Sequence, residues 1–334
     1  MKLCNDSRLI FVRNTIAIVV MLMVLMSASA SYAHVRWFIN ADSAALSDYP
    51  VYTFFDYEIL IWIAIGLVLI GTSIFLDGKL PKIPIIKTKT RHDILESLRI
   101  FTGMSFLLTA YGGALIAPHM QAYGSFGTSL LFLQALIGIM LISNNLLHYA
   151  AIMLLLLFTG IMVQFGFILA LEYSNIVGIA LFFLFNNMPT KALSERFKPY
   201  SVDILRIFTG IALVTLGVSE KIYGSELGQS FITKYPWNFM HALGFDFFTN
   251  QLFVLSAGMM EVIMGTILIL GTTTRLNTLV ISIFMLISNT VFLLVNQNEN
   301  ALLELVGHMP IISTAVIFLF LGYGRRLKIT NLFK

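Results

Sequence analysis

Charged residues and cysteine are both scarce in this sequence. Only 11% of the 334 residues are charged, whereas an ordinary soluble domain has about a quarter. Cys4 is the single cysteine and precedes the first apolar run, so the chain lacks the cysteines of an iron–sulfur cluster. The sequence also has neither a histidine pair with haem-ligand spacing nor a Rossmann glycine pattern. These scarcities exclude an ordinary soluble domain and make any redox role depend on a bound cofactor or a partner protein.

Apolar residues are correspondingly abundant: they form 58% of the chain, and the mean hydropathy is +0.86. Glycine and aromatic residues are spread through long apolar runs, as in helices that pack within a lipid bilayer. The sequence therefore predicts an all-α, polytopic membrane helix bundle. About nine runs approach the ~20 residues that span a bilayer, at 57–76, 98–117, 128–142, 147–167, 174–185, 204–222, 252–270, 276–295 and 305–322.

The N-terminal region has the three-part pattern of a secretory signal peptide. Basic residues precede the short apolar stretch 16–26, and small residues follow it, with Ser31 and Ala33 at the minus-three and minus-one positions of a cleavage site. This pattern predicts that residues 1–33 are removed and that His34 becomes the mature N-terminus. The alternative is an uncleaved additional helix.

Basic residues outside this leader indicate an orientation in the membrane. If the mature N-terminus lies outside, then Arg36, Lys221 and Lys234 are the only Lys or Arg residues on that side. Because Lys and Arg resist translocation, this asymmetry predicts an outside N-terminus and an inside C-terminus. We expect the bacterial cytoplasmic (inner) membrane as the location.

The chain shows signs of an internal repeat. "DILESLRIFTG" ends at Gly103 and "DILRIFTG" at Gly210, while "LEYSNIVGIALFFLF" resembles "LELVGHMPIISTAVIFLF". The sequence thus predicts two related four-helix units after one extra helix. The predicted divisions are the signal peptide 1–33, the first transmembrane helix with its flanking segments 34–92, the first four-helix unit 93–190, the second unit 203–323 and the tail 324–334.

Charged side chains within the apolar runs are candidate site residues, because charge is costly in a membrane interior. The second unit has such residues near its predicted outer side, and we name Glu220, Lys221, Glu261, Glu304 and His308 as candidate catalytic residues. Small residues at helical spacing accompany Lys221 and Glu261, which favours a neutralising ion pair between the two. Glu304 is four residues before His308 and can fix its tautomer. The alternative is that these charges only hold helices together.

The first unit has the uncharged "YGGAL" where the second has Glu220 and Lys221. Its polar residues Glu172 and His119 are expected at the membrane interface. The aromatic residues of "HVRWF", which starts at His34, are expected to lie there as well.

Three segments, "LRIFTGIALVTLGVSEKI", "GMMEVIMGTILILGTTTRL" and "LVGHMPIISTAVIFLFLG", together resemble the DoxX-like family of membrane proteins. The resemblance extends over residues 203–322, with a weaker echo over residues 93–185. It implies a four-helix membrane bundle, and some members of the family are linked to thiosulfate:quinone oxidoreduction or redox-defence complexes. The signal peptide, the extra helix and the apparent doubling depart from the family pattern.

The first functional hypothesis is a subunit of a quinone-linked or redox-defence membrane complex. A quinone requires an apolar slot with one or two polar groups at its carbonyls. Lys221 or His308 can donate hydrogen bonds there, and Glu261 can relay protons. The expected partners are the lipid bilayer and a redox partner protein, with no nucleic acid.

The second hypothesis is copper handling on the outer side. A mature N-terminus at His34 offers an amine and an imidazole, which suit Cu(II). The predicted topology also places further histidines outside, which gives as candidate ligands His34, His119, His241 and His308. A non-catalytic scaffold or small-solute permease is the third hypothesis.

Overall fold

The computed structural model describes residues 35–39, 49–80, 88–235, 237–294, 296–322, 324 and 326–331, and in these ranges it is helical. Seven of the described helices are long and apolar enough to cross a membrane, which fits the predicted polytopic bundle. The predicted signal peptide, its cleavage site and His34 lie outside the described residues. We use the term strap for residues 35–39, and the term tail for residues 326–331.

The helices follow one another with short connections. Their bounds are α2 Tyr57–Leu76, α3 Thr88–Tyr111, α4 Gly124–Ile142, α5 Leu147–Phe165, α6 Phe167–Leu171, α7 Asn175–Asn186, α8 Lys191–Phe197, α9 Ser201–Leu216, α10 Ser225–Lys234, α11 Phe239–Ala242, α12 Asn250–Leu270, α13 Thr274–Leu294 and α14 Asn298–Val316. Short π-helical segments continue α9 over Gly217–Ile222 and α14 over Ile317–Leu321.

Two of the expected spans differ from the prediction. The run 98–117 belongs to α3, which begins ten residues earlier in a charged stretch and ends at Tyr111, before a turn in which Ala114 pairs with Gln121. The run 174–185 is the short helix α7, about 18 Å long at 1.5 Å per residue. A hydrocarbon core is ~30 Å thick. The turn before α7 can therefore lie within the bundle rather than at its end.

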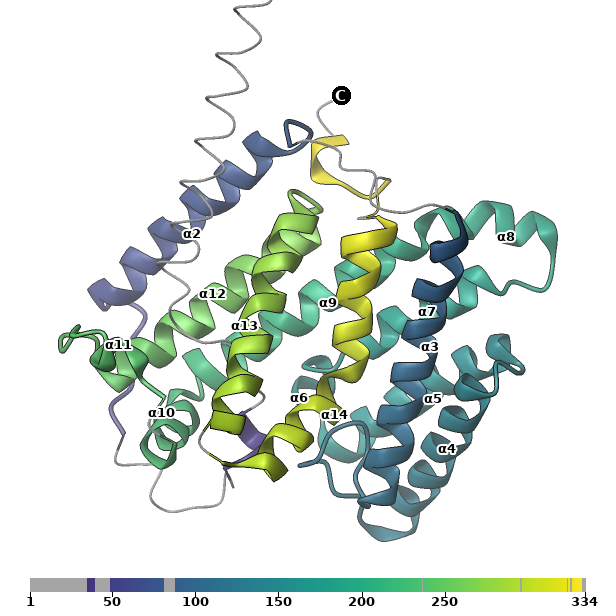
Figure 1. Ribbon diagram of the computed structural model, residues 1–334, viewed down its shortest axis with the longest axis horizontal. Coiled ribbons are helices and arrows are strands. Elements are labelled where there is room, and N and C mark those ends of the chain that lie inside the picture. The colour runs from purple at the N-terminus through teal and green to yellow at the C-terminus, as the bar shows by residue number, and fades with distance from the viewer. Residues whose placement is uncertain are drawn as a thin grey trace, which may run out of the picture.

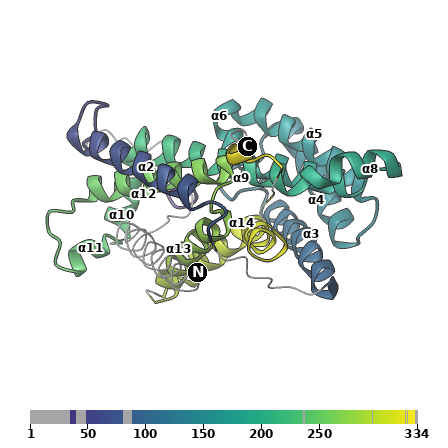
Figure 2. The same ribbon diagram turned by 90° about the horizontal axis from the view of Figure 1, so that it is seen from above.

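Eight helices form a closed arrangement (Figures 1 and 2). In chain order α3, α4, α5, α7, α9, α12, α13 and α14 each pack against the next, and α14 returns to pack on α3. The last helix of each predicted unit therefore contacts the first helix of the other unit. Helix α2 packs on the outside of α12. The strap lies at the end where α14 begins, and the tail lies at the opposite end (Figure 1).

Arginine side chains fix the first helix of each unit to the second helix. Arg99 of α3 donates hydrogen bonds to the carbonyl oxygens of Leu141 and Ile142, at the end of α4. Arg206 of α9 donates in the same way to Leu268 and Ile269, at the end of α12. Carbonyls in the last turn of a helix lack the usual partner four residues further on, and the guanidinium groups add hydrogen bonds to them. The two contacts match what the predicted repeat requires, while the duplication itself stays a prediction.

The same helix pairs cross at glycine. A Cβ at Gly210 would lie 2.6 Å from the carbonyl oxygen of Gly265, and a Cβ at Gly103 would lie 2.9 Å from that of Gly138. The backbones of α9 and α12 thus approach as closely as small residues permit, as is common between helices in membranes. Because the two backbones are so close, side chains of α9 and α12 on either side of the crossing can contact one another directly.

We predict that Gly210→Ala destabilises the protein by about 1–3 kcal/mol, because the added methyl group overlaps the backbone of α12. The matched control is Gly71→Ala in α2, where a Cβ would have no atom within 4 Å. Thermal unfolding in detergent should show a lower Tm for the first variant and an unchanged or slightly higher Tm for the second. Equal Tm values would contradict the close crossing.

Candidate functional site

Lys221 and Glu261 form a buried ion pair between the π-helical segment after α9 and the middle of α12. The Lys221 Nζ lies 2.6 Å from Glu261 Oε1 and 2.7 Å from Oε2. The lysine side chain is fully buried, and that of Glu261 is 6% exposed. The predicted pairing is thus present in the structure, and each charge compensates the other where water does not.

Two glycines make room for this pair. A Cβ at Gly217 would lie 2.7 Å from the carbonyl oxygen of Gly258, and a Cβ at Gly258 would lie 2.8 Å from Cβ of Lys221. The Lys221 side chain therefore packs against α12 at Gly258, where α12 has no side chain. The π-helical turn adds a residue to the helix at this point, a feature frequent at functional sites.

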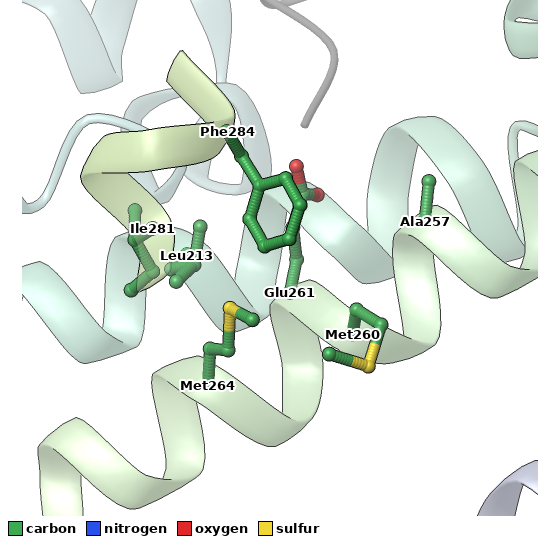
Figure 3. A pocket seen from close by; sticks show the side chains of 7 residues that line it. All are labelled: Leu213, Ala257, Met260, Glu261, Met264, Ile281 and Phe284. Carbon is green, nitrogen blue, oxygen red and sulfur yellow. The ribbon is translucent and has the colours of Figure 1, made fainter. Parts of the chain in front are cut away.

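Glu261 also lines a small pocket between α9, α12 and α13, with an enclosed volume of about 20 Å³ (Figure 3). The remaining lining is apolar and comprises Leu213, Ala257, Met260, Met264, Ile281 and Phe284. The carboxylate is the one charged group in this lining, and Phe284 lies beside it in Figure 3. The composition of this lining is typical of small-molecule sites, but the enclosed volume is about that needed for one water molecule. A larger ligand therefore requires the lining side chains to move apart.

The neighbouring residue Glu220 makes a different set of contacts. Its Oε2 accepts a hydrogen bond of 2.8 Å from the backbone N–H of Val35 in the strap. Its Oε1 lies 3.7 Å from Nε of Arg36, whose Nη1 lies 3.2 Å from Oε1 of Glu172. One guanidinium group therefore binds a carboxylate from each predicted unit, and both carboxylate side chains are fully buried.

Glu172, which the sequence predicts at the membrane interface, is buried inside the protein against Arg36 of the strap and Ser219 of the π-helical segment. Glu172 is 2% exposed, in the turn between α6 and α7, and it accepts a 2.6 Å hydrogen bond from Ser219. Burial raises the pKa of Glu172 to about 7, with the negative charge of Glu220 adding to the effect and Arg36 opposing it.

The predicted pair on α14 lies beside the strap. His308 Nδ1 is 4.0 Å from Oε1 of Glu304, and both residues are buried. The His308 ring centroid lies 4.9 Å from that of Trp37. The Trp37 Nε1–H in turn donates a 3.1 Å hydrogen bond to the hydroxyl of Tyr173. The strap therefore links α14 of the second unit to the turn before α7 in the first.

The candidate metal ligands do not meet as a group. His119 lies in the turn after α3, with its ring centroid 6.1 Å from that of Tyr173, whereas His308 packs against Trp37. His241 is exposed in α11. Among the described residues, no group of three His, Cys, Asp or Glu side chains could hold a metal ion. Burial, with a contribution from Arg36, lowers the pKa of His119 to about 3 and keeps its imidazole neutral.

The first unit has a neutral amide where the second has its ion pair. Gln134 precedes Gly138 by four residues, as Glu261 precedes Gly265. Its Nε2 donates to the carbonyl of Ala114, and its Oε1 accepts from the N–H of Ile116. The buried polar position is thus satisfied by backbone groups of the turn after α3, and it carries no charge.

Sequence reasoning missed four residues of this site: Arg36, Trp37, Glu172 and Tyr173. The strap aromatics were expected at the membrane interface, but Trp37 and Phe38 are each only 9% exposed. The similarity of "LEYSN" to "LELVG" pairs Glu172 with Glu304 and was the available signal. No local pattern indicated that the strap would meet both carboxylate-bearing segments.

The fold and this buried polar cluster define a polytopic helical membrane protein with a charged site between its helices. Residues 201–294, in the second half of the chain, match the family model described as DoxX. The match includes Glu220, Lys221, Glu261 and the pocket, whereas the strap, Glu172, Glu304 and His308 lie outside it. No curated protein and no solved structure matches the chain.

We predict that Glu172→Gln changes the pH dependence of stability. The pKa of Glu172 rises from its ordinary 4.5 to about 7 in the folded protein. The stability contributed by the protonated group is therefore present below pH 4.5 and is lost as the pH rises through 7. Glutamine stays neutral, so the Tm of the variant should be close to wild type at pH 5 and higher at pH 8.

Glu195→Gln is the matched control, because the Glu195 side chain is 71% exposed and its variant should follow wild type at both pH values. Thermal unfolding in detergent provides the measurement. A lower Tm for Glu172→Gln at pH 8 would mean that the ion pair with Arg36 outweighs the cost of burial.

Proposed function

We propose that this protein is a membrane subunit of a quinone-linked redox complex and that its DoxX-matching region binds the quinol headgroup in the pocket beside Glu261. The observation that carries the proposal is the combination of an apolar pocket with a single carboxylate, held by a buried lysine. A headgroup with two polar oxygens on an apolar ring fits such a lining. Electrons would pass to a partner protein, since the single cysteine lies in the predicted signal peptide.

The polar group in the pocket fits the reduced form of the ligand. An ionised carboxylate only accepts hydrogen bonds, so Glu261 can accept one from a quinol hydroxyl and can take its proton. The Lys221 ammonium holds both carboxylate oxygens and keeps this acceptor in one orientation. In the proposed role, Glu261 is the proton acceptor and Lys221 is the positioning residue, which supports the predicted relay.

The proposed setting is the bacterial cytoplasmic membrane, with the strap end outside and the tail end inside. Basic residues support this orientation. Arg196 lies in α8, Lys198 follows that helix and Lys328 lies in the tail, and these segments are at the end of the bundle opposite the strap (Figure 1). Removal of residues 1–33 and an origin of the two units by duplication belong to the same proposal.

The copper and permease hypotheses have less support. His119 and His308 both approach the Trp37–Tyr173 pair, but His241 lies apart from them in α11. A permease with two equivalent halves would be expected to carry similar polar groups in each half. Here Gln134 in the first unit corresponds to Glu261 in the second.

We predict that Glu261→Gln weakens binding of a short-chain benzoquinol by about tenfold or more, because a hydrogen bond to a charged group contributes ~1.5–3 kcal/mol. Calorimetric titration of the purified full chain measures the Kd. Lys221→Met should also weaken binding, since it leaves Glu261 without its counter-ion.

Glu195→Gln serves again as the control and should bind like wild type. Unchanged affinity in folded Glu261→Gln would exclude the pocket as the headgroup site. Absence of saturable quinol binding to the wild-type chain would reject the proposed function as a whole.

A further inference from the structure

The strap is bound between the two four-helix units although it belongs to neither. Its first three residues form a single short 3-10 turn, Val35–Trp37, and Val35 is fully buried (Figure 1, purple). Its contacts come from α10, α13 and α14, from the turn before α7 and from the π-helical segment after α9. Arg36, Trp37 and Phe38 each contact a different set of residues.

The partners of Arg36 form a charge site. Glu172 and Glu220 come from different units, and both point at the same guanidinium group. The other buried cation nearby, Lys221, places its ammonium on both oxygens of Glu261. The strap therefore adds a positive charge at a place where two buried carboxylates from different units meet. The Arg36 side chain remains 25% exposed.

The partners of Trp37 form a site shaped for an indole ring. A Cβ at position 307 would lie 2.1 Å from the Trp37 ring, so only Gly307 leaves space for it on α14. The neighbouring His308 ring packs against the indole, and Tyr173 accepts the hydrogen bond from Nε1. The flat face of the Trp37 ring thus packs on α14, and its N–H group has a hydrogen-bond acceptor.

The partners of Phe38 are aromatic rings from α10 and α13. Its ring centroid lies 5.0 Å from that of Phe292, 5.7 Å from that of Phe231 and 6.3 Å from that of Tyr235. At the same residue, the carbonyl oxygen accepts a 3.2 Å hydrogen bond from Nζ of Lys234. The backbone is therefore hydrogen-bonded at Val35 and at Phe38, on either side of Arg36 and Trp37.

We propose that the strap end of the bundle is a peptide-recognition site whose ligand is a short segment with a guanidinium group followed by two aromatic side chains. The chain fills this site in cis with residues 35–38. Charge, ring shape and backbone are each recognised by dedicated groups, as in a bound peptide. The bound segment joins the two units at this end, because its partners belong to both. This inference is independent of quinol binding.

The test uses the full-length chain with the cis ligand weakened by Arg36→Ala and Trp37→Ala together. The probe is the fluorescent, C-terminally amidated peptide Val-Arg-Trp-Phe-Ile, and anisotropy measures its binding. We expect saturable binding to the double variant and binding weaker by about tenfold or more to wild type, in which the site is filled. The control combines Arg196→Ala with Tyr223→Ala, an arginine and an aromatic residue outside the site, and should behave as wild type.

A second peptide, Val-Ala-Trp-Phe-Ile, distinguishes specific binding of the arginine from nonspecific binding of the aromatic residues. It should bind the double variant at least about tenfold more weakly than the arginine peptide does. Equal affinity of the two peptides, or equal binding to wild type and double variant, would overturn the proposal. If the double variant aggregates, each peptide is added during extraction from the membrane. Recovery of monodisperse protein with the arginine peptide alone supports the site, and recovery with neither peptide or with both refutes it.

Discussion

The cost of an uncompensated charge in an apolar interior determines how this bundle is assembled. Lys221 and Glu261 neutralise each other, Arg36 compensates Glu172 and Glu220, and the tail residue Lys328 binds Asp77 at the end of α2. Each of these contacts joins segments far apart in the chain. Because breaking a buried pair leaves a charge without a partner, these contacts restrict the helices to arrangements that keep every pair intact.

The π-helical turn over Gly217–Ile222 is where two of these requirements meet. Glu220 and Lys221 are adjacent in sequence, yet the first binds the strap and the second binds α12. The close approach of Gly217 to Gly258 lets the lysine reach its partner at the pocket. One turn of helix therefore contacts the strap through Glu220 and the pocket residue Glu261 through Lys221, so a shift of the turn would alter both proposed sites together.

The sequence predicts the long apolar helices well, because twenty apolar residues leave few other structures in a membrane. It also predicts the Lys221–Glu261 pair, since small residues at helical spacing accompany both. It does not predict the burial of Glu172, whose partners Arg36 and Ser219 come from distant parts of the chain. Nor does it reveal the strap contacts, as Val35 and Glu220 are separated by 185 positions and no periodic pattern connects them.

The difference between the two units bears on what the protein does. In the second unit the polar position before the helix crossing carries Glu261, which needs Lys221. At the corresponding position of the first unit, Gln134 is satisfied by backbone groups of the turn after α3. A neutral amide so bound has no proton to exchange at neutral pH, whereas a carboxylate beside a lysine does. In the proposed quinol role, proton transfer is therefore assigned to Glu261 of the second unit, whereas the first unit contributes packing surface and the carboxylate of Glu172 that binds Arg36.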